Sequence, residues 1–278
     1  MTCEQGPLRI DLQRIVRERV PASKRRWIPR FVVRRLEKLV CQDELNGILQ
    51  RTYPKTGSAF ATAALKDLNI TIEVRGMENI PETGRFIFAS NHPLGGLDGI
   101  ALISVLGAKY SDENLRFPVN DMLMNVRPLR GVFIPINKFG RQGREAARKL
   151  AETYASDAQI IFFPAGLVSR LHKGGVIKDL EWQKAFVAKA MEYNRDVIPV
   201  HFSGNNTMKF YRTAKWRKRL GLKFNFEQIL LPKELCKAKG SRYIITFGKP
   251  IKAADLKASG KSAPALAAEI RNSVYQLK

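Results

Sequence analysis

A histidine and a carboxylate leave the end of a predicted strand together, in residues 91–98, which read NHPLGGLD. The apolar run before them, residues 86–90, has the pattern of a buried strand bounded by turn residues. An imidazole with a carboxylate behind it can remove a proton from a hydroxyl, because the carboxylate fixes the ring tautomer and stabilises the imidazolium that forms. His92 and Asp98 are therefore candidate catalytic residues, although single His/Asp neighbours are also common outside active sites.

A second predicted strand ends in the same way. Residues 160–163 read IIFF and are followed by a turn and polar residues, PAGLVSR, over 164–170. In open α/β sheets ligands bind at the carboxyl ends of the strands. Two such strand ends predict one shared edge at which the two loops meet.

The elements around these loops alternate between strand and helix. The strands are predicted at 70–74, 86–90, 117–119, 132–136, 160–163, 197–202 and 243–247. The helices are predicted at 58–68, 98–107, 143–154, 182–193, 207–220 and 263–276. This alternation predicts an α/β fold with a mixed, largely parallel sheet flanked by helices. We expect a basic helical segment over 1–52 and one larger domain over 53–278.

The chain is strongly basic: its 278 residues carry 48 Lys and Arg against 25 Asp and Glu, a net charge of +23. Such a balance predicts an anionic partner, which leaves a membrane, an acidic protein and nucleic acid open. Three scattered cysteines indicate no disulfide framework, and the three histidines have no zinc-ligand spacing, so we expect no metal. The sequence also predicts neither a transmembrane helix nor a signal peptide, hence a peripheral protein at the cytoplasmic face.

Basic residues gather in two places. In the segment 1–52 apolar residues recur at helical spacing between arginines, with Trp27 at a junction between two predicted helices. Residues 209–223 hold seven Lys and Arg and no acid, interleaved with aromatic and apolar side chains. Basic amphipathic helices of this kind bind anionic membranes, but an apolar stripe can equally pack on its own domain.

The motifs together resemble the glycerolipid acyltransferase superfamily, which carries Asn-His-x4-Asp and, later, Phe-Pro-Glu-Gly-Thr-Arg-Ser. A third family block, Gly-x-x-Phe-Ile-x-Arg, is similar to residues 131–137, and a proline-containing strand to residues 197–201. The four blocks occur in order across residues 70 to 250. This resemblance implies acyl transfer from a thioester without a bound cofactor, with His92 as general base oriented by Asp98.

Departures from the family pattern concern the acceptor. Five residues separate His92 from Asp98, Ala165 replaces the glutamate, and Asn137 replaces the arginine of the other block. The chain is thus similar to the hemolysin-like branch of amino-acid-lipid O-acyltransferases. That branch implies an acyl group transferred to the 3-hydroxyl of an N-acyl amino acid such as ornithine or glycine, a lyso-lipid acceptor.

The same resemblance suggests substrate-binding residues. The backbone of the turn at Pro164 and Gly166 is expected to hold an oxyanion or a carboxylate, and Arg170 the acceptor's anionic group. The remaining candidates are Ser169, Asn137, Lys138 and Arg141, of which Lys138 and Arg141 are also compatible with solvated surface charge.

Other functions stay open at this point. A 1-acylglycerol-3-phosphate or lysophospholipid acyltransferase would keep the chemistry and change the acceptor. A nucleic-acid-binding protein is disfavoured, because the sequence has no zinc-finger, RRM-like or P-loop pattern. A lytic membrane protein would not need the His92/Asp98 pair. The donor is acyl carrier protein or acyl-CoA, and the basic surface would attract either.

Overall fold

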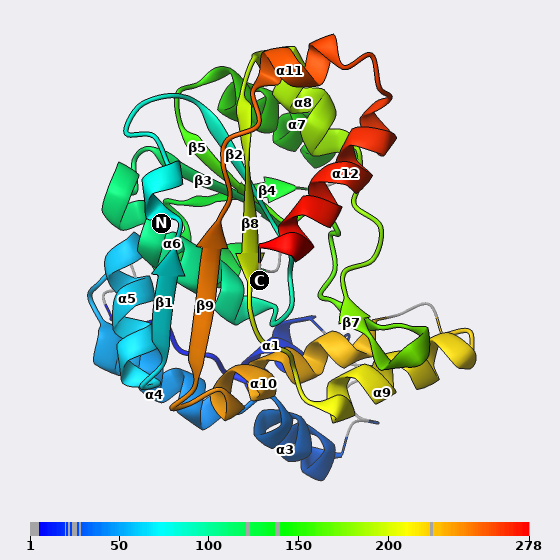
Figure 1. Ribbon diagram of the computed structural model, residues 1–278. Helices are drawn as coiled ribbons and strands as arrows, with labels where there is room; N and C mark the ends of the chain where they lie inside the picture. The colour runs from blue at the N-terminus through cyan, green and yellow to red at the C-terminus, as the bar shows by residue number, and fades with distance from the viewer. Residues whose placement is uncertain are drawn as a thin grey trace.

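The computed structural model describes residues 6–19, 21, 23, 27, 29–120, 123–136, 140–222 and 225–277. Its centre is a seven-stranded sheet in the order β1-β9-β8-β2-β5-β3-β4, with helices on both sides (Figure 1). The strands are β1 (Thr71–Arg75), β2 (Phe86–Ser90), β3 (Leu115–Asn120), β4 (Phe133–Ile136), β5 (Gln159–Phe162), β8 (Asp196–Phe202) and β9 (Arg242–Phe247). All neighbours in this sheet pair in parallel except β8 and β9, which confirms the predicted mixed, largely parallel sheet.

Strand β2 lies inside the sheet between β5 and β8, and all five of its residues are buried. Its alternate side chains enter two different cores, so the strand is apolar on both faces, as expected when helices cover both sides of a parallel sheet. Because β2 is parallel to both neighbours, the carboxyl ends of β2, β5 and β8 lie at the same edge. That edge receives the loops after residues 90, 162 and 202.

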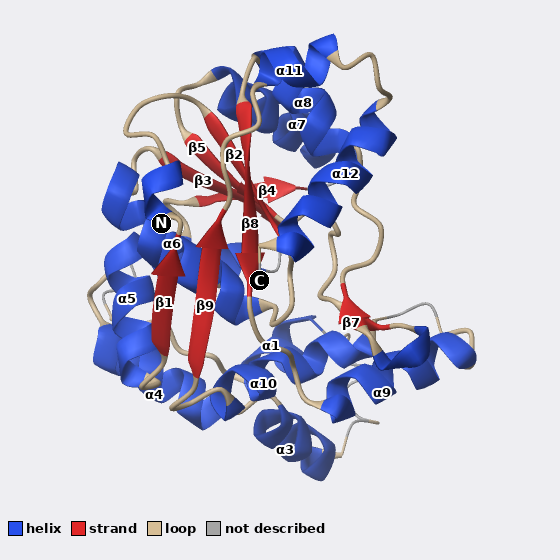
Figure 2. Ribbon diagram, viewed as in Figure 1, coloured by secondary structure: helices blue, strands red, loops and turns tan. Residues whose placement is uncertain are grey.

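The helices form two layers (Figure 2). One core contains Phe60 and Leu102 together with strand side chains, and the other contains Phe186 and Ile270. The first layer consists of α4 (Gln42–Thr52), α5 (Gly57–Asp67), α6 (Gly96–Tyr110) and α10 (Leu231–Lys237). The second consists of α7 (Gly140–Ala155), α8 (Ala185–Tyr193), α11 (Ala253–Ala258) and α12 (Ala263–Gln276).

The basic N-terminal segment is partly packed and partly exposed. It contains α1 (Leu12–Arg19) and α3 (Arg30–Leu39), and α4 follows a left-handed residue, Cys41, with φ of 51°. Ile48 and Leu49 of α4 belong to the core of the sheet, whereas Phe31 of α3 is 64% exposed and Trp27 76% exposed. The apolar stripe of this segment therefore supplies both core contacts and an exposed aromatic surface.

The predicted strands of the sheet and the predicted helices are present, with ends that differ by a few residues. The pattern did not indicate the hairpin of β6 (Arg170–Leu171) and β7 (Ile177–Lys178), nor α10 and α11. Strands of two residues and helices of two turns or fewer are too short to show a periodicity. Among the described residues, short 3-10 turns lie at Met77–Asn79, Leu123–Asn125, Arg127–Leu129, Lys173–Gly175 and Phe226–Leu230.

Helix α9 (Met208–Arg219) matches the prediction of a helix over 207–220. Within the ranges given above, none of the helices combines the length and the apolar character needed to cross a bilayer.

Candidate active site

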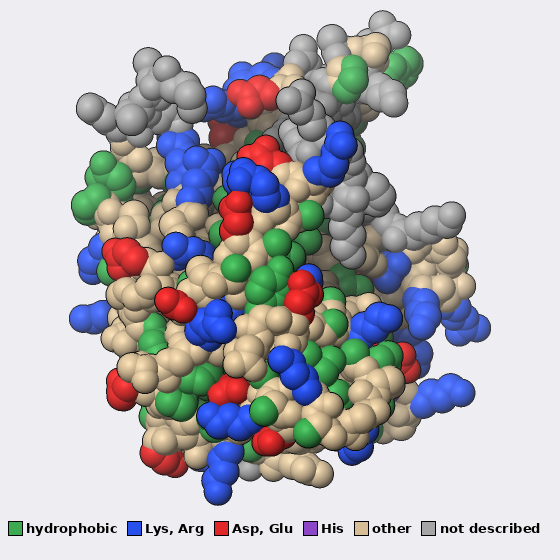
Figure 3. All heavy atoms as spheres, turned by 90° about the horizontal axis from the view of Figure 1, so that it is seen from above, with side chains coloured by type: hydrophobic (Ala, Val, Ile, Leu, Met, Phe, Trp, Pro, Cys, Tyr) green, Lys and Arg blue, Asp and Glu red, His purple; other side chains and the backbone are tan. Residues whose placement is uncertain are grey.

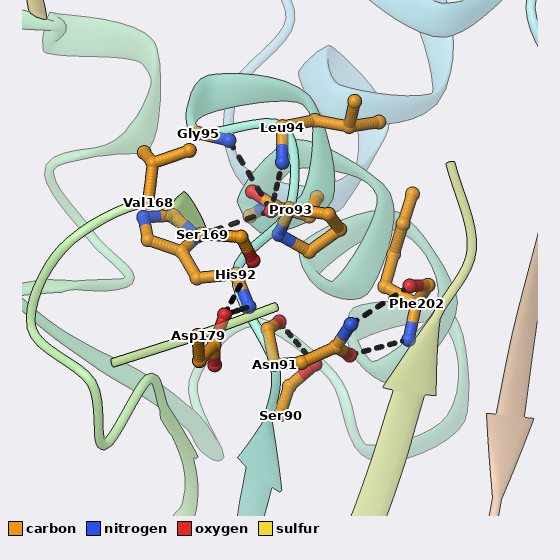
Figure 4. Close-up of polar contacts among 12 residues, drawn as sticks. Ser90, Asn91, His92, Pro93, Leu94, Gly95, Val168, Ser169, Asp179 and Phe202 are labelled. Carbon is orange, nitrogen blue, oxygen red and sulfur yellow. Dashed lines mark hydrogen bonds and ion pairs between the residues drawn. The ribbon is translucent and has the colours of Figure 1, made fainter. Parts of the chain in front are cut away.

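The loop after β2 brings His92 and Asp98 together. Nδ1 of His92 lies 3.1 Å from Oδ2 of Asp98, which stands in the first turn of α6 and is fully buried. The same carboxylate accepts the backbone N–H groups of Leu94 and Gly95 through Oδ2 and of Gly99 through Oδ1 (Figure 4). Gly95 has φ of +89°, a conformation that disfavours other residues. The five-residue spacing thus closes into a direct His–Asp contact.

Two contacts hold the imidazole of His92: Asp98 at Nδ1 and an aromatic ring on one face. Its ring stacks on Phe163, the first residue after β5, with centroids 4.1 Å apart, and the side chain remains 18% exposed. Since Nδ1 faces Asp98, the opposite edge of the ring carries Nε2. Burial of the ring acts to lower the pKa of His92, but the charge and hydrogen bond of Asp98, with a smaller effect of Asp179, outweigh it and raise that pKa above its ordinary value.

Asn91 fixes this loop to the neighbouring strand. Its side-chain NH₂ donates to the carbonyl of Phe202, and its side-chain oxygen accepts the N–H of the same residue, at 2.9 and 2.7 Å. The amide thereby completes the pairing at the end of β8, which positions the residue next to His92 (Figure 4).

The loops after β2 and β5 meet, as their shared edge predicts. The N–H of Ser169 donates to the carbonyl of His92 at 2.8 Å. In the loop after β5, Gly166 has φ of +64°. Its N–H donates to the carbonyl of Phe163 and closes the turn that contains Pro164. A histidine paired with a buried carboxylate at the carboxyl edge of a sheet is an arrangement suited to deprotonating a hydroxyl.

Comparison with known proteins identifies the family. A family model described as Acyltransferase matches residues 14–278. The chain belongs to this acyltransferase family. The predicted glycerolipid acyltransferase-like superfamily and the predicted enzyme class are thereby confirmed.

Two curated relatives of the acyltransferase are closely similar in sequence and length. A lyso-glycine lipid O-acyltransferase of Phocaeicola vulgatus is 46% identical over 242 residues, which cover 87% of this chain and 86% of the relative. A lyso-glycine lipid O-acyltransferase of Bacteroides thetaiotaomicron is 45% identical over 242 residues, 87% of this chain and 88% of the relative. A solved 1-acyl-sn-glycerophosphate acyltransferase from Thermotoga maritima aligns at 17% identity with a TM-score of 0.47, over 96% of this chain and 86% of its own.

In the acyltransferase, Arg170 lies near the site but its charge is shared. Its Nη2 is 2.9 Å from Oε1 of Glu227, a fully buried carboxylate, and Nη1 donates to the carbonyl of Val168. Arg217 of α9 approaches the other oxygen of Glu227 at 2.8 Å. Burial lowers the pKa of Arg170, while the charge of Glu227 acts to raise it. Two arginines on one carboxylate leave one net positive charge behind this part of the edge.

The other sequence candidates are distributed unevenly. Ser169 is buried, and its hydroxyl donates to Asp179, which also accepts the backbone N–H of His92. Asn137 and Lys138 lie outside the described residues, and the side chain of Arg141 does too. Within the described chain, no group of three or more His, Cys, Asp and Glu side chains gathers in the manner of a metal site.

A cavity of about 310 Å³ borders the loop without including His92. Asn91, Pro93 and Ser169 contribute to its wall, opposite His201 of β8 and Tyr275 of α12. His201 is buried and packs edge-on against Tyr275, with ring centroids 6.1 Å apart. This hollow therefore lies beside the loop after β2, on the α12 side of the sheet.

Sequence reasoning missed Asp179 and Trp182, which line the back of the site. Asp179 follows β7 directly, and Nε1 of Trp182 donates to its Oδ2 at 2.9 Å. We predicted a helix from residue 182, whereas α8 begins at Ala185 and Trp182 belongs to the turn before it. The one available signal was an acid and a tryptophan three residues apart after a glycine-rich turn.

Proposed function

We propose that this acyltransferase moves a fatty acyl group from a thioester to the 3-hydroxyl of an N-acyl amino acid, with glycine as the amino acid. The observation that carries the proposal is the direct contact between His92 and Asp98 at the open edge of the sheet. The two lyso-glycine lipid O-acyltransferases that are 46% and 45% identical support the acceptor. The product is a diacylated amino-acid lipid.

The chemistry follows from the geometry of the pair. Nε2 of neutral His92 takes the proton of the acceptor hydroxyl while that oxygen attacks the thioester carbonyl. Collapse of the tetrahedral intermediate breaks the C–S bond, and the imidazolium returns its proton to the departing thiolate. Asp98 keeps the proton of the resting imidazole on Nδ1 and stabilises the imidazolium. No bond forms between the acyl group and the enzyme.

The test is a competition between acceptors. The enzyme is given labelled acyl-acyl carrier protein or acyl-CoA with N-(3-hydroxyacyl)glycine, N-(3-hydroxyacyl)ornithine and lysophosphatidic acid in equal amounts. Label in the diacylated glycine lipid is expected to exceed label in the other products at least tenfold. Label mainly in phosphatidic acid would show that the acceptor is a lysophospholipid, and transfer to none of them would contradict the proposal.

The donor is proposed to be a thioester with an anionic carrier. Both acyl carrier protein and the phosphates of acyl-CoA are attracted by a surface with a net charge of +23. The same assay separates them, because kcat/KM is measured with each donor at equal concentration of one acyl chain.

The acceptor and product are amphiphiles, so we place the site at an anionic membrane. On α9 the side chain of Trp216 is 61% exposed, and Leu220, just beyond its end, is 65% exposed. The exposed basic residues of the helix are Lys209, Arg212, Lys215, Lys218 and Arg219. This mixture of apolar and basic side chains suits the interface of an anionic bilayer. Both α9 and α3, which bears exposed Phe31, lie at the lower edge of the molecule in Figure 1.

Charge reversal on α9 tests this placement. The variant Lys215→Glu with Lys218→Glu is expected to bind phosphatidylglycerol vesicles at least about thirtyfold more weakly, since each basic residue near an anionic surface contributes about 1 kcal/mol. Sedimentation with vesicles measures the affinity.

The matched control is Lys257→Glu with Lys261→Glu, which changes the net charge equally. These lysines lie in or beside α11, at the opposite end of the molecule from α9, where acidic and basic side chains are interspersed (Figure 3). The control is expected to bind nearly as the wild type does. Equal losses in both variants would mean that net charge alone, and not α9, governs vesicle binding.

A further inference from the structure

A second buried carboxylate, Asp179, stands directly behind the catalytic loop. Its Oδ1 accepts the backbone N–H of His92 at 3.2 Å and the hydroxyl of Ser169 at 2.5 Å (Figure 4). Its Oδ2 accepts the indole N–H of Trp182 at 2.9 Å. The residue is fully buried. One side chain thus connects the loop after β2, the loop after β5 and the turn before α8.

The backbone of Asp179 is fixed as well. Its N–H donates to the hydroxyl of Tyr275 at 2.7 Å, and its carbonyl accepts a hydrogen bond from the guanidinium of Arg271. Both partners belong to α12, which packs in the second helix layer against one face of the sheet. The carboxylate therefore approaches His92 from a rigid support, which is the arrangement by which outer residues orient a reacting group.

The three groups that hydrogen-bond to this carboxylate are an amide, a hydroxyl and an indole, all of them neutral. Burying a charge against neutral donors is unfavourable for stability, and burial raises the pKa of Asp179 in spite of these bonds. A neutral side chain of the same shape would form most of the contacts at a lower cost. A negative charge at this position is thus better explained by its effect on the adjacent imidazole.

Three charged side chains affect the protonation of the His92 imidazole. Asp98 of α6 and Asp179 both favour the protonated imidazole, and Arg170 of β6 opposes it. During acyl transfer the imidazole becomes a cation. Two carboxylates, one on the ring and one behind the backbone, would stabilise this cation more than Asp98 alone.

We propose that Asp179 is a positioning residue of acyl transfer, which holds the His92 loop by its hydrogen bonds and stabilises the imidazolium by its charge. The proposal rests on the role of His92 as general base proposed above. This role would explain why one acid, which follows β7, bonds to both site loops and to α12.

The decisive variant is Asp179→Asn, which keeps the size of the side chain and removes its charge. We expect kcat to fall at least about tenfold. In the plot of kcat/KM against pH, we expect the acidic limb, where activity rises as His92 loses its proton, to move to lower pH by roughly half a unit or more. The limb moves down because loss of a nearby negative charge makes imidazolium less stable. Release of coenzyme A thiol from acyl-CoA between pH 5.5 and 9 measures both, and circular dichroism establishes that the variant is folded.

Two further variants distinguish charge from structure. Tyr275→Phe removes the acceptor of the Asp179 N–H and leaves the carboxylate and its three donors, so the rate is expected to fall without a shift of the limb. Asp179→Glu retains the charge, so the limb is expected to stay near that of wild type even where the longer side chain lowers the rate. It serves as the test if the asparagine variant does not fold.

A folded Asp179→Asn enzyme with the wild-type limb would overturn the inference, as would a limb that Tyr275→Phe moves equally. His92→Ala separates this failure from failure of the proposed function. If His92→Ala is inactive while Asp179→Asn keeps the wild-type limb, only the role of Asp179 is wrong. If His92→Ala keeps its activity, the general-base mechanism itself is wrong.

Discussion

His92→Ala is expected to lower kcat/KM for acyl transfer about 10³-fold, because the acceptor hydroxyl loses the group that takes its proton. The substitution leaves Asp98 with the N–H groups of Leu94, Gly95 and Gly99, so the loop keeps most of its hydrogen bonds. The measurement is thiol release from acyl-CoA with N-(3-hydroxyacyl)glycine present, and the thermal unfolding midpoint establishes folding.

The matched control is His172→Ala. His172 lies beside the hairpin and its Nε2 is 3.1 Å from the carbonyl of Lys178, away from the His92–Asp98 contact. Its replacement is expected to change kcat/KM less than threefold. Retention of more than a tenth of the activity in His92→Ala would exclude the imidazole as the general base. In that event the contact with Asp98 would have a structural role.

Asp98→Asn is expected to change both the rate and its pH dependence. The pKa of His92 is raised because the effect of Asp98 exceeds that of burial. A general base is active when neutral, so wild-type kcat/KM is expected to rise with pH through a midpoint above about 6.5, the ordinary value for histidine. Without the charge of Asp98 the effect of burial dominates, and the midpoint is expected to fall below that value.

The plateau of Asp98→Asn at high pH is expected to lie about 10²- to 10⁴-fold below that of wild type, because an amide does not fix the required tautomer. Profiles of kcat/KM from pH 5.5 to 9 measure the midpoint and the plateau in one series. A midpoint that stays at the wild-type value would show that Asp98 does not control the titration of His92. A midpoint that rises would contradict the sign of its charge effect.

The sequence and the structure agree on the part of the site that is local in the chain. His92 and Asp98 follow one predicted strand, so the sequence predicted that both leave the same strand end, whereas the structure decided that their five-residue spacing brings the side chains into contact. The chain order of strands and helices likewise predicted the sheet, because burial on both faces leaves continuous apolar runs. Short elements such as β6, β7 and α10 left no pattern to detect.

The contacts that the sequence did not reveal join residues far apart along the chain. Asp179 is 87 positions from His92, and its partners Arg271 and Tyr275 are more than ninety positions farther along the chain. A single buried acid has no periodicity and no spacing that marks its partner. Arg170 was predicted to bind the acceptor's anionic group, and the sequence did not reveal that Glu227, 57 positions away, pairs with it. The role of Arg170 in binding the acceptor stays a prediction. Any account of that role includes the ion pair between Arg170 and Glu227.

The sequence by itself determined the family and the enzyme class through its resemblance in four motif blocks. It determined the layered sheet and the His/Asp pair through residue types at short spacing along the chain. The tertiary structure alone placed the charge of Asp179 near the imidazole and paired Arg170 with Glu227. Electrostatic effects fall off with distance in space and depend on burial, and neither quantity is encoded in the separation of two residues along the chain.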